Sequence, residues 1–145
     1  MATIEKPSAK MIVAADDSPE DLFFLTRTLE KLGLKHSIVT ASDGEQVISM
    51  LKHQPVPDLL LLDLKMPKMS GFEVLQWLRN RPEFNRLPVI VFSSSDLETD
   101  HSRAIDLGAN EYRVKSPDLK SLENMLLELD SRYLQAKFSK SDTQS

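Results

Sequence analysis

The 145-residue chain contains no cysteine, so it can form neither a disulfide framework nor a thiolate metal site. No apolar stretch approaches the ~20 residues that a membrane-spanning helix needs. The first ten residues, MATIEKPSAK, lack the apolar core of a signal peptide. Basic residues do not outnumber acidic ones: the net charge is −4, and no basic stripe favours nucleic-acid binding. We therefore expect a cytoplasmic protein that binds neither membrane nor nucleic acid.

Hydrophobic residues make up 41% of the chain and charged residues 28%, which is the balance of a soluble globular domain. The length fits one domain with a sizeable core. We expect residues 1–10 to be a flexible lead, residues 11–136 to form the domain and residues 137–145 to be a polar tail. No repeat and no second, output domain is expected.

Five short runs rich in apolar and β-branched residues predict strands, and stretches with helical spacing of leucines and valines separate them. The expected strands are residues 11–15, 37–41, 59–62, 88–92 and 112–114. Continuously apolar runs of this length are typical of parallel strands that are buried on both faces. The alternation of strand and helix predicts an α/β fold, a doubly wound parallel sheet with right-handed crossovers.

Two of the expected helices begin at recognisable caps. Ser70 followed by Glu73 three residues later has the form of a capping box. Ser116 followed by Pro117 predicts that Ser116 caps the last helix, with proline at its first position.

Polar side chains follow four of the expected strands: Asp16-Asp17, Asp63, Ser93 and Lys115. In an open parallel sheet these strand ends meet at one crevice, where ligands bind. Crowded carboxylates raise their pKa values or recruit a cation, and an all-oxygen site suits Mg²⁺. A carboxylate can also attack phosphorus, while a hydroxyl and an ammonium stabilise phosphoryl oxygens. The set as a whole therefore predicts phosphoryl-transfer chemistry.

These residues resemble, in order, the receiver domain of response regulators in two-component signalling. The matching segments are Asp16-Asp17, Asp63 within LLLLDLKMPKMSG, Ser93 after LPVIVF and Lys115 after YRV. The resemblance covers about residues 10–135 and implies a flavodoxin-like (βα)5 sheet in strand order 2-1-3-4-5. The ADDSPED start and the expected lack of an output domain are similar to small, chemotaxis-regulator-like proteins, including those that partner bacteriophytochromes.

The resemblance implies an aspartyl-phosphate site that depends on Mg²⁺, with Mn²⁺ as an alternative ion. Asp63 resembles the phospho-acceptor and also a metal ligand. Asp17 resembles the acid that contacts the metal directly, and Asp16 the acid that acts largely through a water. The backbone carbonyl of Lys65 matches the third protein ligand.

The resemblance also assigns the residues that would respond to phosphorylation. Ser93 resembles the switch hydroxyl, Tyr112 the aromatic residue whose rotamer reports activation, and Lys115 the lysine that binds the phosphoryl group. Lys65 and Ser95 occupy positions that tune the lifetime of the phosphoryl group in this family.

The function that follows is a switch in a phosphorelay rather than an enzyme, with activity limited to self-phosphorylation and self-dephosphorylation. A histidine kinase or a phosphotransfer protein would supply the phosphoryl group to Asp63. The face formed by the fourth helix, fifth strand and fifth helix would then recognise a partner, or a second copy in a homodimer.

Two other functions stay open at this point. A phosphohydrolase with an aspartyl-phosphate intermediate commonly has a second acid two residues after the nucleophile, where this chain has Lys65. A pseudo-receiver that is never phosphorylated is supported only by Ser116, which replaces the usual proline after Lys115. A cis Lys115–Ser116 bond would cost roughly 3 kcal/mol, so we expect this bond to be trans.

The sequence does not indicate a histidine metal site, because no metal-ligand spacing links the three histidines. We expect all three at the surface: His36, His53 and His101.

Overall fold

Five parallel strands form one sheet in the order β2-β1-β3-β4-β5, which confirms the predicted fold and strand order. The computed structural model describes residues 9–135. The polar tail and most of the flexible lead expected at the two ends therefore lie outside the described residues. The strands are β1 (Met11–Ala15), β2 (Ser37–Ala41), β3 (Leu59–Leu62), β4 (Val89–Ser93) and β5 (Glu111–Val114).

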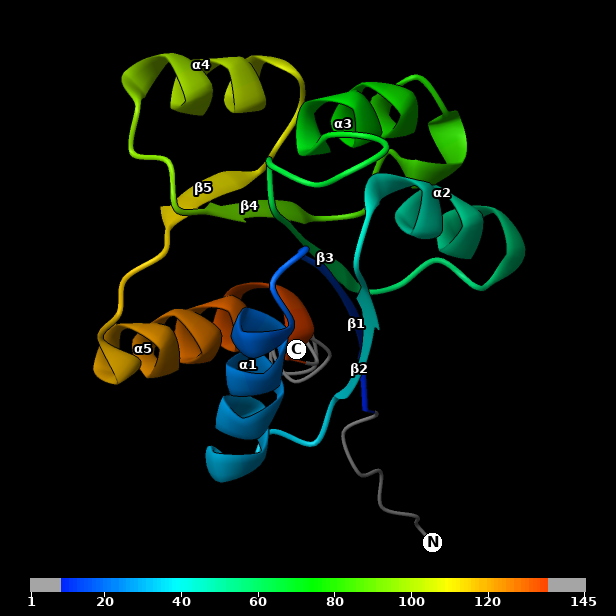
Figure 1. Ribbon diagram of the computed structural model, residues 1–145. Helices are drawn as coiled ribbons and strands as arrows, with labels where there is room; N and C mark the ends of the chain where they lie inside the picture. The colour runs from blue at the N-terminus through cyan, green and yellow to red at the C-terminus, as the bar shows by residue number, and fades with distance from the viewer. Residues whose placement is uncertain (1–8, 136–145) are drawn as a thin grey trace, which may run out of the picture.

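Helices cover both faces of the sheet (Figure 1). One face carries α1 (Pro19–Lys31) and α5 (Leu119–Leu129). The other carries α2 (Gly44–His53), α3 (Gly71–Arg79) and α4 (Glu98–Asp106). A 3₁₀ turn η1 (Pro82–Phe84) precedes β4, and a π-turn η2 (Asp130–Leu134) follows α5. Among the described helices, none is both long and apolar enough to cross a membrane.

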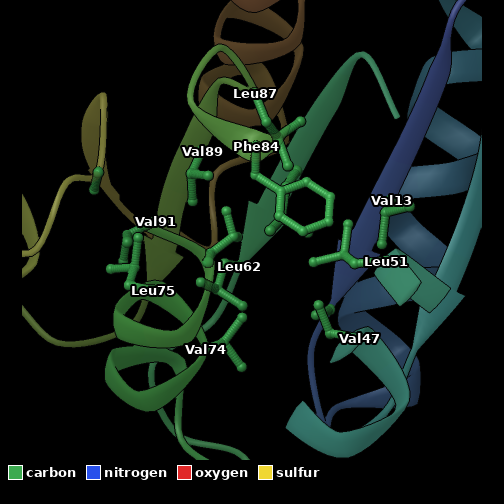
Figure 2. Close-up of a cluster of buried hydrophobic side chains, with 14 of the residues drawn as sticks. Val13, Val47, Leu51, Leu62, Val74, Leu75, Phe84, Leu87, Val89 and Val91 are labelled. Atoms are coloured by element: carbon green, nitrogen blue, oxygen red, sulfur yellow. The ribbon is translucent and has the colours of Figure 1, made fainter. Parts of the chain in front are cut away.

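Each helical layer has its own hydrophobic core, because neighbouring residues of a strand point to opposite faces. Ile12, Leu61 and Ile90 pack toward α1 and α5. Their neighbours in the chain face α2, α3 and α4, where they meet side chains such as Val47 and Val74 (Figure 2). A fully buried leucine or valine contributes about 1.5–3 kcal/mol, so the central strands are firmly held. These strands fix the positions of the residues that follow them.

The start of α5 differs from the prediction. Asp118, not Ser116, is the N-cap: its side chain accepts a hydrogen bond from the backbone N–H of Lys120, 3.2 Å away. The Ser116 hydroxyl instead accepts from the N–H of Asp118 (3.1 Å), which makes a turn before the helix. No cis peptide bond occurs within residues 9–135, so the expectation of a trans Lys115–Ser116 bond is confirmed.

Candidate functional site

The register of β1 and β3 brings two of the predicted acids together. Ala15 pairs with Leu62, so the residues that follow them, Asp16 and Asp63, leave the sheet at the same level. The backbone N–H of Asp63 donates to the carbonyl of Ala15 across this end of the ladder, at 3.0 Å. One Asp16 oxygen accepts from the N–H of Ser18 (2.9 Å), which fixes its carboxylate over the strand ends.

Asp16, Asp17 and Asp63 form a cluster in which each offers a carboxylate oxygen, all within 4.8 Å of one another. Asp16 and Asp63 are buried and Asp17 is exposed, so the cluster has a dry side and an open side. Carboxylate oxygens at this spacing are the ligands that a hard divalent ion prefers. The donor set therefore fits Mg²⁺ or Mn²⁺.

Lys115 enters the same cluster from the end of β5. Its backbone N–H donates to the carbonyl of Ser93 at 2.8 Å, which aligns the ends of β4 and β5. Its ammonium lies 2.6 Å from an oxygen of Asp16 and 3.5 Å from one of Asp63. Burial alone would lower the pKa of Lys115, but hydrogen bonds to Asp16 and Asp21 and the charge of Asp63 raise it above its usual value. The lysine is a permanent positive charge beside the acids.

Asp63 is the acid whose proton affinity is most altered. Burial and then the charge of Asp16 raise its pKa from 3.8 to about 6, against the lowering effect of Lys115. One of its oxygens accepts from the N–H of Leu64 at 2.8 Å. The other oxygen faces the ammonium of Lys115. This carboxylate is therefore ionised at neutral pH but poorly solvated, which favours attack on an electrophile or binding of a cation.

The predicted switch residues are linked by hydrogen bonds through Ser95. The buried hydroxyl of Ser93 accepts from the N–H of Ser95 at 3.2 Å. The Tyr112 hydroxyl donates to the Ser95 carbonyl at 2.8 Å. The Ser95 hydroxyl donates to a carboxylate oxygen of Asp100, at the start of α4, at 2.6 Å. A change at Ser93 can thus reach both β5 and α4.

Lys65 is exposed and lines a cavity of about 580 Å³ beside the cluster, together with Asp17 and Asp100. Its loop returns to α3 through Gly71, whose N–H donates to the carbonyl of Leu64 at 2.9 Å. A side chain at position 71 would collide with the backbone carbonyl of Asp63. The glycine therefore lets α3 begin directly against the end of β3.

Three residues in these contacts were not predicted from the sequence. Asp21, in the first turn of α1, lies 2.8 Å from the ammonium of Lys115. Asp100 holds the Ser95 hydroxyl, and the ring of His101 stacks on Tyr112 with centroids 5.1 Å apart. The sequence places Asp21 only in the acidic first turn of the expected helix, where it reads as a favourable charge for the helix dipole. Asp100 and His101 lie in a polar helix with no distinguishing pattern.

Comparison with known proteins agrees with this geometry. The model of the response regulator receiver domain matches residues 12–127. Response regulator Rcp1 of Synechocystis sp. is 32% identical over 137 residues, which cover 90% of this chain and 93% of that protein. The solved structure of the Mn²⁺-bound form of Rcp1 covers 85% of this chain and 93% of its own, with a TM-score of 0.76.

Two further solved structures are of a phytochrome and a bacteriophytochrome response regulator. The phosphorylated cyanobacterial phytochrome response regulator RcpA is 32% identical, with a TM-score of 0.80 over 88% of this chain and 95% of that one. The bacteriophytochrome response regulator AtBRR is also 32% identical, with a TM-score of 0.71 over 84% and 92% of the two chains. Together with the acid cluster and the strand order, these matches establish that the chain belongs to the response regulator receiver domain family of two-component signalling.

Proposed function

We propose that this protein is a phospho-accepting switch in which Asp63 takes a phosphoryl group from a histidine kinase or a phosphotransfer protein. The observation that carries the proposal is the environment of Asp63: a buried carboxylate at a central strand end, beside two further acids and one ammonium. Receiver domains as a family receive phosphate from such donors. A kinase donor would place the reaction in the cytoplasm.

In the transfer, a carboxylate oxygen of Asp63 forms a bond to phosphorus while the phosphorus–nitrogen bond of the donor's phosphohistidine breaks. The imidazole leaves with the electron pair of that bond. Asp16, Asp17, Asp63 and the backbone carbonyl of Lys65 would hold Mg²⁺ or Mn²⁺. When bound, the ion supplies positive charge against the phosphoryl oxygens. The ammonium of Lys115 supplies further charge from the end of β5.

The new phosphoryl group would attract the two donors nearest to the strand ends, Ser93 and Lys115. If the Ser93 hydroxyl turns to donate to a phosphoryl oxygen, the contact that it accepts from Ser95 changes. Ser95 also anchors Tyr112 and the start of α4, so the loop between β4 and α4 would shift as one unit. A partner protein or a second copy of this chain would then bind the face formed by α4, β5 and α5. Lys65, exposed beside the cluster, and Ser95 would tune how long the phosphoryl group persists.

The test is intact-mass spectrometry of the protein after incubation with acetyl phosphate and Mg²⁺. We expect a single phosphate adduct that disappears with EDTA and in Asp63→Asn, but persists in the control Asp96→Asn, which removes an exposed acid after β4. An adduct in Asp63→Asn would contradict the proposal.

The same preparation separates the switch from the two rival functions. Steady release of phosphate from p-nitrophenyl phosphate would indicate a phosphohydrolase. No adduct and no binding of the phosphoryl mimic beryllofluoride, in protein shown to be folded, would indicate a pseudo-receiver.

A further inference from the structure

We propose that Asp21 is a positioning residue that holds the ammonium of Lys115 while Asp63 is unphosphorylated, and that it competes with the phosphoryl group for this ammonium. The inference rests on the proposed function, because it concerns how Lys115 is delivered to phosphorylated Asp63. It assigns a role to a residue that the sequence did not mark as part of the site.

The ammonium of Lys115 has three hydrogens, and its contacts with acids are unequal. The oxygens of Asp16 and Asp21 lie 2.6 Å and 2.8 Å from the nitrogen. The oxygen of Asp63 lies at 3.5 Å, the limit of a hydrogen bond. In this state the lysine is bound mainly by the two acids of the β1–α1 segment. A phosphoryl group on Asp63 would have to draw the lysine away from at least one of them.

Of the two close ion pairs of Lys115, the pair with Asp21 is the easier one to break. Asp16 is buried within the acid cluster, with 7% of its side chain exposed, and it is itself a proposed metal ligand. The side chain of Asp21 is 42% exposed, so water can replace the ammonium at little cost. Asp21 and Lys115 also line a common cavity of about 590 Å³, which gives the pair room to separate.

The backbone around Asp21 holds its carboxylate in reach of Lys115. Ser18 caps α1 and its hydroxyl accepts from the N–H of Asp21 at 3.2 Å, with Pro19 at the first helical position. Asp21 is therefore fixed in the first turn of a helix that begins just after the acid cluster. Glu20, the preceding residue, is exposed and shares this turn, but within residues 9–135 no ion pair joins it to Lys115.

Removal of the Asp21 carboxylate should favour the phosphorylated state. An amide at this position accepts a weaker hydrogen bond from the ammonium than a carboxylate does, so Lys115 becomes available to the phosphoryl group. The substitution also removes one negative charge near a group that becomes a dianion. Glu20→Gln removes the same charge from the same turn without touching Lys115, and so isolates the effect of the contact.

The experiment is a titration of the full chain with beryllofluoride in the presence of Mg²⁺, followed by ¹⁹F NMR. We expect Asp21→Asn to bind the mimic about three- to five-fold more tightly than wild type, the scale of a half-exposed ion pair. Glu20→Gln should match wild type. Asp21→Glu, which restores a carboxylate, should return the affinity toward wild type, and the melting temperature of each variant reports whether the fold is intact.

The outcomes separate this inference from the proposed function. Equal affinities for Asp21→Asn and Glu20→Gln, weaker binding by Asp21→Asn, or failure of Asp21→Glu to restore the wild-type affinity would each overturn the role of Asp21 alone. A folded wild type that binds no mimic would overturn the proposed function, and this inference with it.

Discussion

Asp63 is a residue whose ionisation is costly in the folded protein without metal. Burial and the charge of Asp16 raise its pKa to about 6, whereas an ordinary aspartate has 3.8. The native state therefore binds this proton more tightly than the unfolded state does between about pH 4 and pH 6. The contribution of Asp63 to stability is greatest below pH 4 and is lost as the pH rises through 6.

Replacement of the carboxyl by a neutral amide should remove this cost. We expect Asp63→Asn, in EDTA at pH 7.5, to raise the free energy of unfolding by about 1–3 kcal/mol. The gain should shrink toward zero at pH 4, where the aspartate is already protonated. Urea unfolding at both pH values measures it, and Asp96→Asn is the control for loss of an exposed acid. Equal stability of wild type and Asp63→Asn at pH 7.5 would contradict the pKa assigned to Asp63.

Single residues also set the limit of what the sequence could predict. Asp16, Asp17, Asp63 and Lys115 were identified because they lie at the ends of expected strands, and the structure brings all of them together. His36 was expected at the surface, and this was wrong: its side chain is 11% exposed and lies 2.6 Å from Asp130. These two residues are 94 positions apart, on the loop before β2 and at the start of η2, so no local pattern relates them.

At the scale of elements, α3 is the helix most closely fitted to the site. The predicted capping box is present: the Ser70 hydroxyl accepts from the N–H of Glu73, and the Glu73 carboxylate accepts from the N–H of Ser70. The box fixes where α3 begins. Gly71 then permits this first turn to touch the backbone of Asp63 and Leu64. Glycine is required at position 71 because any side chain would overlap this backbone, and the sequence does not reveal that contact.

Gly71→Ala should therefore affect both stability and phosphorylation. The added methyl group would meet the backbone of Asp63 and Leu64, just after β3, and relief of the overlap should cost about 1–3 kcal/mol and displace Asp63. We expect the rate of phosphorylation by acetyl phosphate to fall at least several-fold. Ser70→Ala is the matched control: it loses a cap worth about 1 kcal/mol but adds no atom near Asp63. Equal rates in the two variants would show that Gly71 serves only the fold.

The start of α5 illustrates why element boundaries were harder to predict than the elements. Ser116-Pro117 and Asp118 each offer a good N-cap, and local propensity does not choose between them. The structure uses Asp118, while Lys115 stays bonded to the end of β4 and reaches the acid cluster. The short turn at Ser116-Pro117 links Lys115 to the N-cap Asp118, so Lys115 can reach the site while α5 begins at Leu119.

At the scale of the whole molecule, the site joins the two halves of the sheet. Asp16 and Asp63 follow β1 and β3, Ser93 is the last residue of β4, and Lys115 follows β5. A ligand that binds these strand ends together binds only the folded protein. Its binding free energy is therefore added to the stability of the entire domain.

Metal binding should accordingly raise the melting temperature, and Asp17 separates this effect from folding itself. At a Mg²⁺ concentration of 100 times the dissociation constant, linkage gives about 2.7 kcal/mol, or roughly 5–10 °C for a domain of this size. Asp17 is exposed, so we expect Asp17→Asn to melt within about 2 °C of wild type in EDTA. Because its carboxylate is proposed to contact the ion, the same variant should lose most of the shift in melting temperature at that Mg²⁺ concentration.

Glu20→Gln, which removes an exposed acid outside the cluster, is the control and should keep the full shift in differential scanning calorimetry. An undiminished shift in Asp17→Asn would mean that the ion binds without Asp17, the exposed acid of this cluster.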